Sequence, residues 1–150
     1  MIRDTIKQAQ IDAMKGGEKE RLAAVRLILA KVKDRDIELR TASTQPDDDT
    51  MIVEVLQKMA KQRRESITMF VDGNREELAE QERKELRVIE GFLPTQLTED
   101  ETRAAILQIK STLGAESIKD MGRVMAELKA RHAAVLDMQT ASRLVKEALS

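Results

Sequence analysis

The chain has 150 residues with no cysteine, tryptophan or tyrosine, a single histidine (His132), and a formal net charge of −1. This composition excludes a disulfide scaffold, a cysteine nucleophile and a thiolate zinc site. The near balance of acidic and basic residues argues against strong nonspecific binding of nucleic acid, although it leaves room for a local basic face. The apolar residues are aliphatic apart from Phe70 and Phe92, and no β-branched alternation occurs. We therefore expect an all-α protein.

Two helices are predicted at the start of the chain. Apolar residues recur at helical spacing over residues 2–14, and Gly16 and Gly17 then interrupt the pattern. A longer helix follows over residues 18–40. The segment 41–49 contains a proline and three successive aspartates, so it predicts an exposed loop.

Two further long helices are predicted before the first strong boundary. Asp49 or Thr50 is expected to cap the third helix, because its side-chain oxygen can accept an unpaired backbone N–H. Gly73 is expected to end that helix, since glycine enters the left-handed conformation without steric cost. A fourth helix is predicted over residues 74–93, with a face rich in Glu and Arg that we expect to be solvated.

Pro94 predicts a division of the chain into two domains. Proline disfavours a helical residue before it, so the fourth helix should end near Leu93. We expect an N-terminal domain of long helical hairpins over residues 1–93 and a small three-helix tail domain over residues 94–150.

Capping signals predict the helices of the tail. Thr98 and Glu101 form a capping-box pattern that starts a helix reaching about residue 113, which Gly114 ends. Ser117 and Asp120 repeat the pattern before a helix that reaches about residue 132. After an irregular turn over 135–139, a last helix is predicted from about residue 140.

Basic side chains are the main candidates for binding. A row of guanidinium and ammonium groups can contact phosphates. The alternatives are local: such runs also form solvated faces, and cations near residue 132 stabilise a helix C-terminus. The candidates are Lys119, Arg123, Lys129, Arg131 and Lys146 in the tail, with Lys61 and Arg64 in the third helix.

Gly122 is an unusual residue for a predicted helix. Glycine within a helix costs about 1 kcal/mol relative to alanine, so its missing Cβ should serve some purpose. We favour close helix packing over close approach of a ligand. Met121 and Met125 lie at core spacing, and we expect both to be buried.

No catalytic or metal-binding constellation is predicted. His132 has no second histidine and no acidic ligand cluster beside it. The sequence has no Walker loop or dinucleotide-binding turn, and residues 47–49 lack calcium-loop spacing. We therefore expect no cofactor and no metal. No apolar run predicts a signal peptide or a membrane span, so a cytoplasmic protein without membrane contact is expected.

Five segments of the chain form an ordered set of motifs: 20–40, 61–67, 73–79, 90–97 and 120–125. Taken together, they resemble the GatB/YqeY family over essentially the whole chain. The resemblance implies an all-α protein with a small helical tail. A related module ends the B subunit of the glutamine-dependent amidotransferase that corrects mischarged tRNA, where it is thought to engage tRNA while the chemistry occurs elsewhere. Residues 133–139 depart from the pattern, because many relatives have glycine there.

Three hypotheses for function follow. The first is a noncatalytic tRNA-binding or tRNA-amidotransferase-related accessory protein, with no DNA partner expected. The second is a module whose helices dock on another helical protein subunit. The third is a carbon–nitrogen ligase that uses glutamine as amido donor, an activity implied by the family name and unsupported by acid–base residues here.

Overall fold

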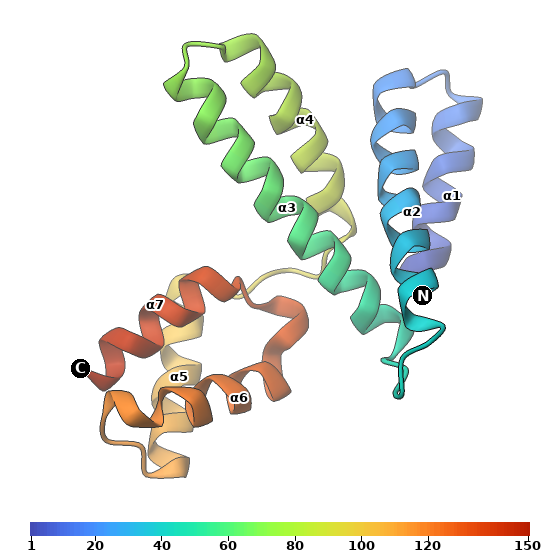
Figure 1. The fold of residues 1–150 in the computed structure, drawn as a ribbon. Helices are drawn as coiled ribbons and strands as arrows, with labels where there is room; N and C mark the ends of the chain where they lie inside the picture. The colour runs from blue at the N-terminus through green and yellow to red at the C-terminus, as the bar shows by residue number, and fades with distance from the viewer. The chain divides into compact units, whose positions relative to one another are not determined.

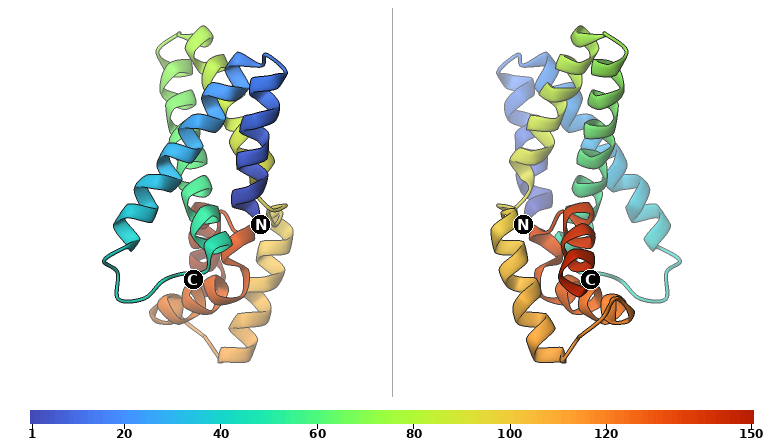
Figure 2. Two further views of the ribbon diagram at one scale, coloured as in Figure 1. Left: turned by 90° about the vertical axis from the view of Figure 1, so that its right-hand side faces the viewer. Right: turned by 90° about the vertical axis from the view of Figure 1, so that its left-hand side faces the viewer.

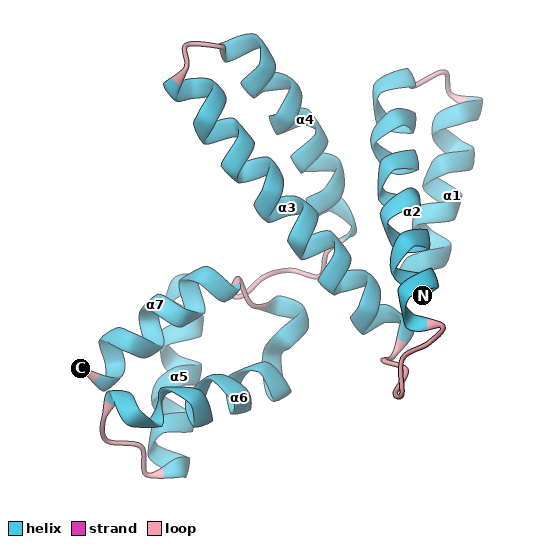
Figure 3. Ribbon diagram, viewed as in Figure 1, coloured by secondary structure: helices cyan, strands magenta, loops and turns pink.

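The computed structural model describes residues 1–150 and contains seven α-helices, two short 3-10 turns and no strand (Figures 1 and 3). The all-α prediction is confirmed. The chain divides into two compact units, Met1–Leu93 (unit 1) and Pro94–Ser150 (unit 2). No helix is both long enough and apolar enough to cross a bilayer.

Unit 1 consists of two helical hairpins. Helix α1 (Ile2–Lys15) packs against α2 (Lys19–Leu39), and α3 (Asp48–Asp72) packs against α4 (Glu76–Phe92). Figures 1 and 2 show α3 and α4 running alongside each other. Both hairpins contribute to a single aliphatic core. Its fully buried side chains include Ile6, Val25, Ile28, Ile52, Leu56 and Ile89.

An arginine near the N-terminus joins three helices of unit 1. The Arg3 guanidinium donates hydrogen bonds to both carboxylate oxygens of Asp36 in α2, at 2.9 and 3.0 Å, and to both of Asp48 in α3, at 2.7 and 3.2 Å. These bonds from Arg3 hold the pKa of Asp48 below its usual range. The backbone N–H of Ile2 donates to Asp49 at 3.0 Å. Asp48 and Asp49 therefore fix the start of α3 against α1.

Two predicted helix ends in unit 1 were wrong in detail. Asp47, rather than Asp49 or Thr50, caps α3 by accepting the Thr50 N–H at 3.2 Å. Asp49 and Thr50 lie inside α3, which begins at Asp48, and Asp49 instead accepts the Ile2 N–H. Gly73 follows α3 as predicted but has φ −85°, and the left-handed residue is Asn74, with φ 57°. Asparagine tolerates this conformation better than other residues with a Cβ.

Unit 2 packs three helices around a second core. Helices α5 (Glu99–Leu113) and α7 (Met138–Leu149) contact each other, and both contact α6 (Met121–His132). Leu113, Met121 and Met125 are partly buried against this core, so both methionines are core residues as predicted. The fully or almost fully buried side chains are Ile106, Ile109, Val124, Leu128, Leu136, Leu144 and Val145.

The local signals of the tail are largely confirmed. Leu93 is extended before Pro94, and Thr98 accepts the Glu101 N–H at 3.1 Å. Gly114 is left-handed, with φ 63°. The capping box of Ser117 and Asp120 is present, although a 3-10 turn over Ile118–Asp120 separates it from α6.

The start of the last helix differs from the prediction. Residues 133–135 form a 3-10 turn, and α7 begins at Met138, two residues before the expected start. The turn is fastened to the chain after Pro94. The Leu97 N–H donates to the Val135 carbonyl at 2.7 Å, and the Gln96 amide donates to the Ala134 carbonyl at 3.1 Å. These two hydrogen bonds join the segment before α5 to the segment before α7, and so they help to hold the two helices together.

Candidate functional site

The predicted basic residues of the tail are exposed and lie on three elements. Lys119 is in the 3-10 turn before α6, Arg123, Lys129 and Arg131 are in α6, and Lys146 is in α7. Arg123 and Arg131 share one face of α6 because they are eight residues apart. Lys129 lies on another face, two residues from Arg131. The five side chains therefore do not form one continuous row.

The two arginines of this set are paired locally. Arg123 donates to Asp120 at 2.8 Å, and Arg131 donates to Glu127 at 2.7 Å. Asp120 also accepts backbone N–H groups of Glu116 and Ser117, and these bonds, together with Arg123, lower the pKa of its carboxyl. Exposed pairs of this kind contribute less than about 1 kcal/mol, so a phosphate can compete for the guanidinium groups.

Three lysines of unit 2 have neither an ion pair nor a hydrogen-bond partner for their ammonium groups. Lys119, Lys129 and Lys146 are exposed, and no carboxylate lies within 4.0 Å of their ammonium groups. The other cations are occupied: Arg103 and Arg143 both pair with Glu99, and Lys110 donates to the Ala148 carbonyl at 2.9 Å. Residues 94–150 contain eight basic and eight acidic residues, so unit 2 is neutral overall. The three lysines are the cations free for a new partner.

The remaining predicted pair lies in unit 1. Lys61 and Arg64 are exposed on α3. Arg64 lies 3.5 Å from Glu90 of α4, a long contact that water screens, whereas Lys61 has no ion pair. Glu65, the sequence neighbour of Arg64, makes no ion pair with either residue. Arg64 is therefore a candidate RNA contact with one weak ion pair, and Lys61 is a candidate RNA contact without an ion pair.

The packing prediction for Gly122 was wrong. Gly122 is exposed in the first turn of α6, and a Cβ built there would meet nothing within 4 Å. Helical spacing identifies which residues share a face, but it does not show that another helix covers that face. The alternative, close approach of a ligand, stays a hypothesis.

The variant Gly122→Ala tests whether the missing Cβ of this glycine serves the approach of a ligand. Alanine should raise the free energy of unfolding of unit 2 by about 0.5–1 kcal/mol, because it removes backbone entropy from the unfolded chain without a clash. Thermal unfolding measures this gain. Gly114→Ala is the matched control: its left-handed backbone should make the same change destabilising. If a ligand approaches Gly122 closely, the alanine variant should be more stable yet bind less tightly.

A half-buried ionic cluster between α3 and α4 was not predicted. Arg63 Nε lies 2.9 Å from Glu85 and 3.3 Å from Glu82, and both Arg63 and Glu82 side chains are 19% exposed. Neither contact is aligned as a hydrogen bond, so Arg63 Nε and Glu82 Oε2 are buried without a hydrogen-bond partner. Burial raises the pKa of Glu82, Arg63 opposes this effect, and Glu85 adds to it. The predicted solvated face of α4 is in part a contact with α3.

The structure offers no acid–base or metal constellation. His132 is half-buried and its ring makes no hydrogen bond or ion pair. No group of three His, Asp or Glu side chains is arranged to hold a metal ion. A Ser–His pair would require His132, and its ring makes no hydrogen bond to a serine.

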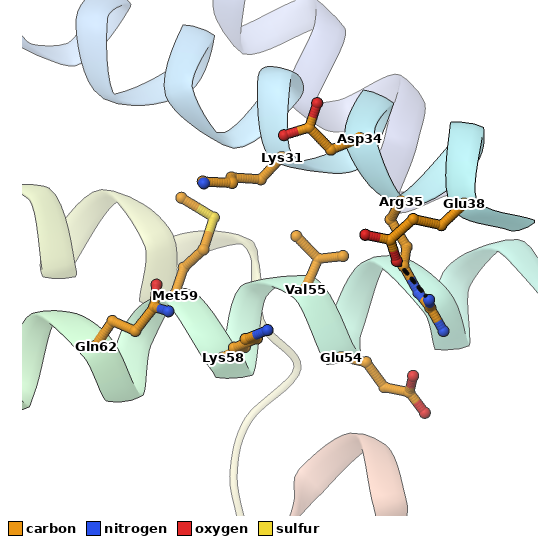
Figure 4. A pocket seen from close by; sticks show the side chains of 9 residues that line it. All are labelled: Lys31, Asp34, Arg35, Glu38, Glu54, Val55, Lys58, Met59 and Gln62. Carbon is orange, nitrogen blue, oxygen red and sulfur yellow. Dashed lines mark hydrogen bonds and ion pairs between the residues drawn. The ribbon is translucent and has the colours of Figure 1, made fainter.

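A groove in unit 1 was also not predicted. A groove of about 380 Å³ runs between α2 and α3 (Figure 4). We call it the α2–α3 groove. Sequence spacing could not identify it, because its two walls come from separate hairpins. The lining residues are Lys31, Asp34, Arg35, Glu38, Glu54, Val55, Lys58, Met59 and Gln62.

Comparison with known proteins identifies the family. Residues 3–149 match the family described as Yqey-like protein. The chain belongs to the YqeY-like family. This assignment confirms the family resemblance found in the sequence.

Two curated relatives of this YqeY-like protein have names that refer to mitochondria. The chain is 29% identical over 111 residues to "Altered inheritance of mitochondria protein 41, mitochondrial" of Kluyveromyces lactis, covering 72% of this chain and 58% of the relative. The protein of that name from Eremothecium gossypii is 29% identical over 116 residues, covering 73% and 62%. The chain thus spans less than two thirds of either relative. The cytoplasmic location stays a prediction.

Proposed function

We propose that this YqeY-like protein is a noncatalytic accessory protein that binds tRNA through unit 2. The observation that carries the proposal is the set of three exposed lysines without ion partners, Lys119, Lys129 and Lys146. Ammonium groups that are not neutralised by the protein can release counterions from phosphates. Arg123 and Arg131 can join them by exchanging Asp120 and Glu127 for phosphate oxygens.

The charge and shape of the unit limit the kind of binding proposed. Neutral overall charge and a discontinuous basic surface support modest affinity that depends strongly on salt. The two phenylalanines lie in unit 1, so base stacking on aromatic side chains is not available in the tail. Recognition would therefore rest on backbone phosphates and shape, as expected for a structured RNA.

The proposal assigns no bond-making step to the isolated chain. A helper role would explain why the family is associated with glutamine-dependent carbon–nitrogen ligases. In this role the protein holds RNA while a partner performs catalysis. The observation that supports this view is that the ring of His132 makes no hydrogen bond or ion pair through which it could activate a nucleophile.

Titration of labelled tRNA with the full chain tests the proposal. Five phosphate contacts predict a slope of log K against log salt of about −4, so affinity should fall roughly 250-fold between about 50 and 200 mM salt. Lys119→Ala/Lys129→Ala/Lys146→Ala should weaken binding and reduce the slope by about 2–3.

A matched variant controls for the loss of three positive charges. Lys15, Lys19 and Lys33 are exposed lysines of unit 1, and none is among the candidate contacts. Alanine at all three should leave the salt slope unchanged. Equal losses in both triple variants would contradict a site on unit 2, as would the absence of saturable binding at low salt.

A further inference from the structure

The α2–α3 groove has an apolar floor that continues into the core of unit 1. Met59 is buried and belongs to that core, and Val55 is half-buried and packs against it. The floor therefore keeps its shape because the core fixes both side chains. The walls consist of long polar side chains that remain exposed. Figure 4 shows Val55 near the middle of the groove, between the α2 and α3 walls.

Charge is divided along the length of this groove. Lys31 of α2 and Lys58 of α3 lie toward the end where Met59 is found, whereas Glu38 and Glu54 lie toward the other end (Figure 4). Arg35 is neutralised by Glu38 at 2.8 Å. Lys31, Lys58 and Glu54 have no ion pair within 4.0 Å. Because Arg35 and Glu38 neutralise each other, the groove presents two unpaired ammonium groups toward one end and the unpaired Glu54 carboxylate toward the other. Asp34 adds a further carboxylate on the α2 wall.

The chemistry of the groove excludes several kinds of occupant. Small-molecule sites are mostly apolar with few polar groups, whereas six of the nine lining residues carry charge. An extended peptide needs a sheet edge or an aromatic-lined groove, and the protein has no strand and no aromatic residue in this lining. Three acidic side chains disfavour a nucleic acid backbone. Docking of a helix into a groove is the peptide-recognition mode that suits an apolar floor flanked by charged walls.

We propose that the α2–α3 groove binds an amphipathic helix of a partner protein. Its apolar stripe would cover Val55 and Met59, with acidic side chains beside Lys31 and Lys58 and a basic side chain beside Glu54. The same distribution of charge along the groove sets the direction of the bound partner helix. Its C-terminal end, which carries partial negative charge, lies toward the two lysines. This interaction is separate from the tRNA proposal, because the groove lies in unit 1.

A synthetic helix serves as the probe for this proposal. The peptide is held helical by a side-chain lactam and has a leucine stripe, lysines in its first turns and glutamates in its last turns. A second peptide has lysine in place of every glutamate. Fluorescence anisotropy measures binding of each to the full chain. The ¹³C methyl resonance of Met59 reports contact at the floor, with the exposed Met14 and Met69 as internal controls.

The expected result is a specific reversal of preference. Lys31→Glu/Lys58→Glu should weaken binding of the first peptide about tenfold or more, because two attractive contacts become repulsive. The all-lysine peptide should bind that variant more tightly than it binds the unmodified chain. Lys33→Glu, two residues from Lys31 on a face outside the groove, should leave both affinities unchanged.

Three results would overturn the proposal. The first is binding that is indifferent to Lys31 and Lys58, and the second is a Met59 signal that does not move on saturation. The third is a Met59 shift that appears on raising protein concentration without peptide, because this would identify a second copy of the chain as the occupant. Failure of tRNA binding would leave this proposal standing, since its readouts involve no RNA.

Discussion

Replacing Leu128 with alanine should unfold much of unit 2 while unit 1 stays folded. Leu128 is fully buried in the second core, which shares no residue with the first. Truncating a buried leucine costs about 2–5 kcal/mol. A core built from fewer than about 70 residues seldom supplies more than about 3–5 kcal/mol. The loss is therefore comparable to the whole stability expected of unit 2.

The reciprocal change is Ile28→Ala in unit 1. Ile28 is also fully buried, so we expect a loss of about 2–5 kcal/mol confined to residues 1–93. Urea unfolding followed by methyl NMR measures both units in one sample. Leu107→Ala is the matched control, because Leu107 is 59% exposed and its truncation should change stability by less than about 0.5 kcal/mol. If either core variant destabilised both units equally, the proposal of two independent domains would be wrong.

Arg63→Met should destabilise unit 1 by about 2–3 kcal/mol near neutral pH. Methionine fills a similar volume, so the cost is electrostatic: Glu82 and Glu85 would lose the cation between them and repel each other in a half-buried contact. Adding Glu82→Gln should restore part of the loss, because it removes that repulsion. Urea unfolding of the single and double variants checks both expectations.

The pH dependence of this variant has a definite sign. Burial holds the pKa of Glu82 above its usual range in the folded protein, against the attraction of Arg63. The folded state thus binds this proton more tightly than the unfolded state. The contribution of Glu82 to stability is fully present below its unfolded pKa and is lost as pH rises through the folded pKa. Without Arg63 the folded pKa rises further.

The Arg63→Met deficit should accordingly be largest at neutral pH and shrink as the medium becomes acid enough to protonate Glu82. Unfolding free energies of both proteins at several pH values measure this difference. A deficit that stays constant with pH would show that Arg63 acts through packing of its side chain alone.

Local chemistry explains which parts of the fold the sequence could predict. Pro94, Gly114 and the pair Ser117 and Asp120 act on their immediate backbone, and the structure shows each of them as expected. The prediction failed at Asp49 because α3 begins one residue before it, so that Asp47 is the cap and Asp49 accepts the N–H of Ile2. Asn74 took the left-handed position expected of the glycine before it.

The contacts between helices could not be predicted from the sequence. The bonds of Arg3 and the cluster around Arg63 depend on how one helix is rotated and shifted against another. Periodicity within each helix carries no such information. The α2–α3 groove has the same origin, as its walls belong to different hairpins. For the candidate RNA contacts, the sequence identified the cations, whereas only the structure showed which ones are paired.

The most direct measurement is an NMR titration of the full chain with tRNA at about 50 mM salt, a concentration that leaves phosphate contacts strong. The proposed function predicts saturable shifts around Lys119, Lys129 and Lys146 in unit 2, which disappear as salt is raised, with Met59 in the groove unmoved. No saturable shift, or shifts confined to unit 1, would contradict it.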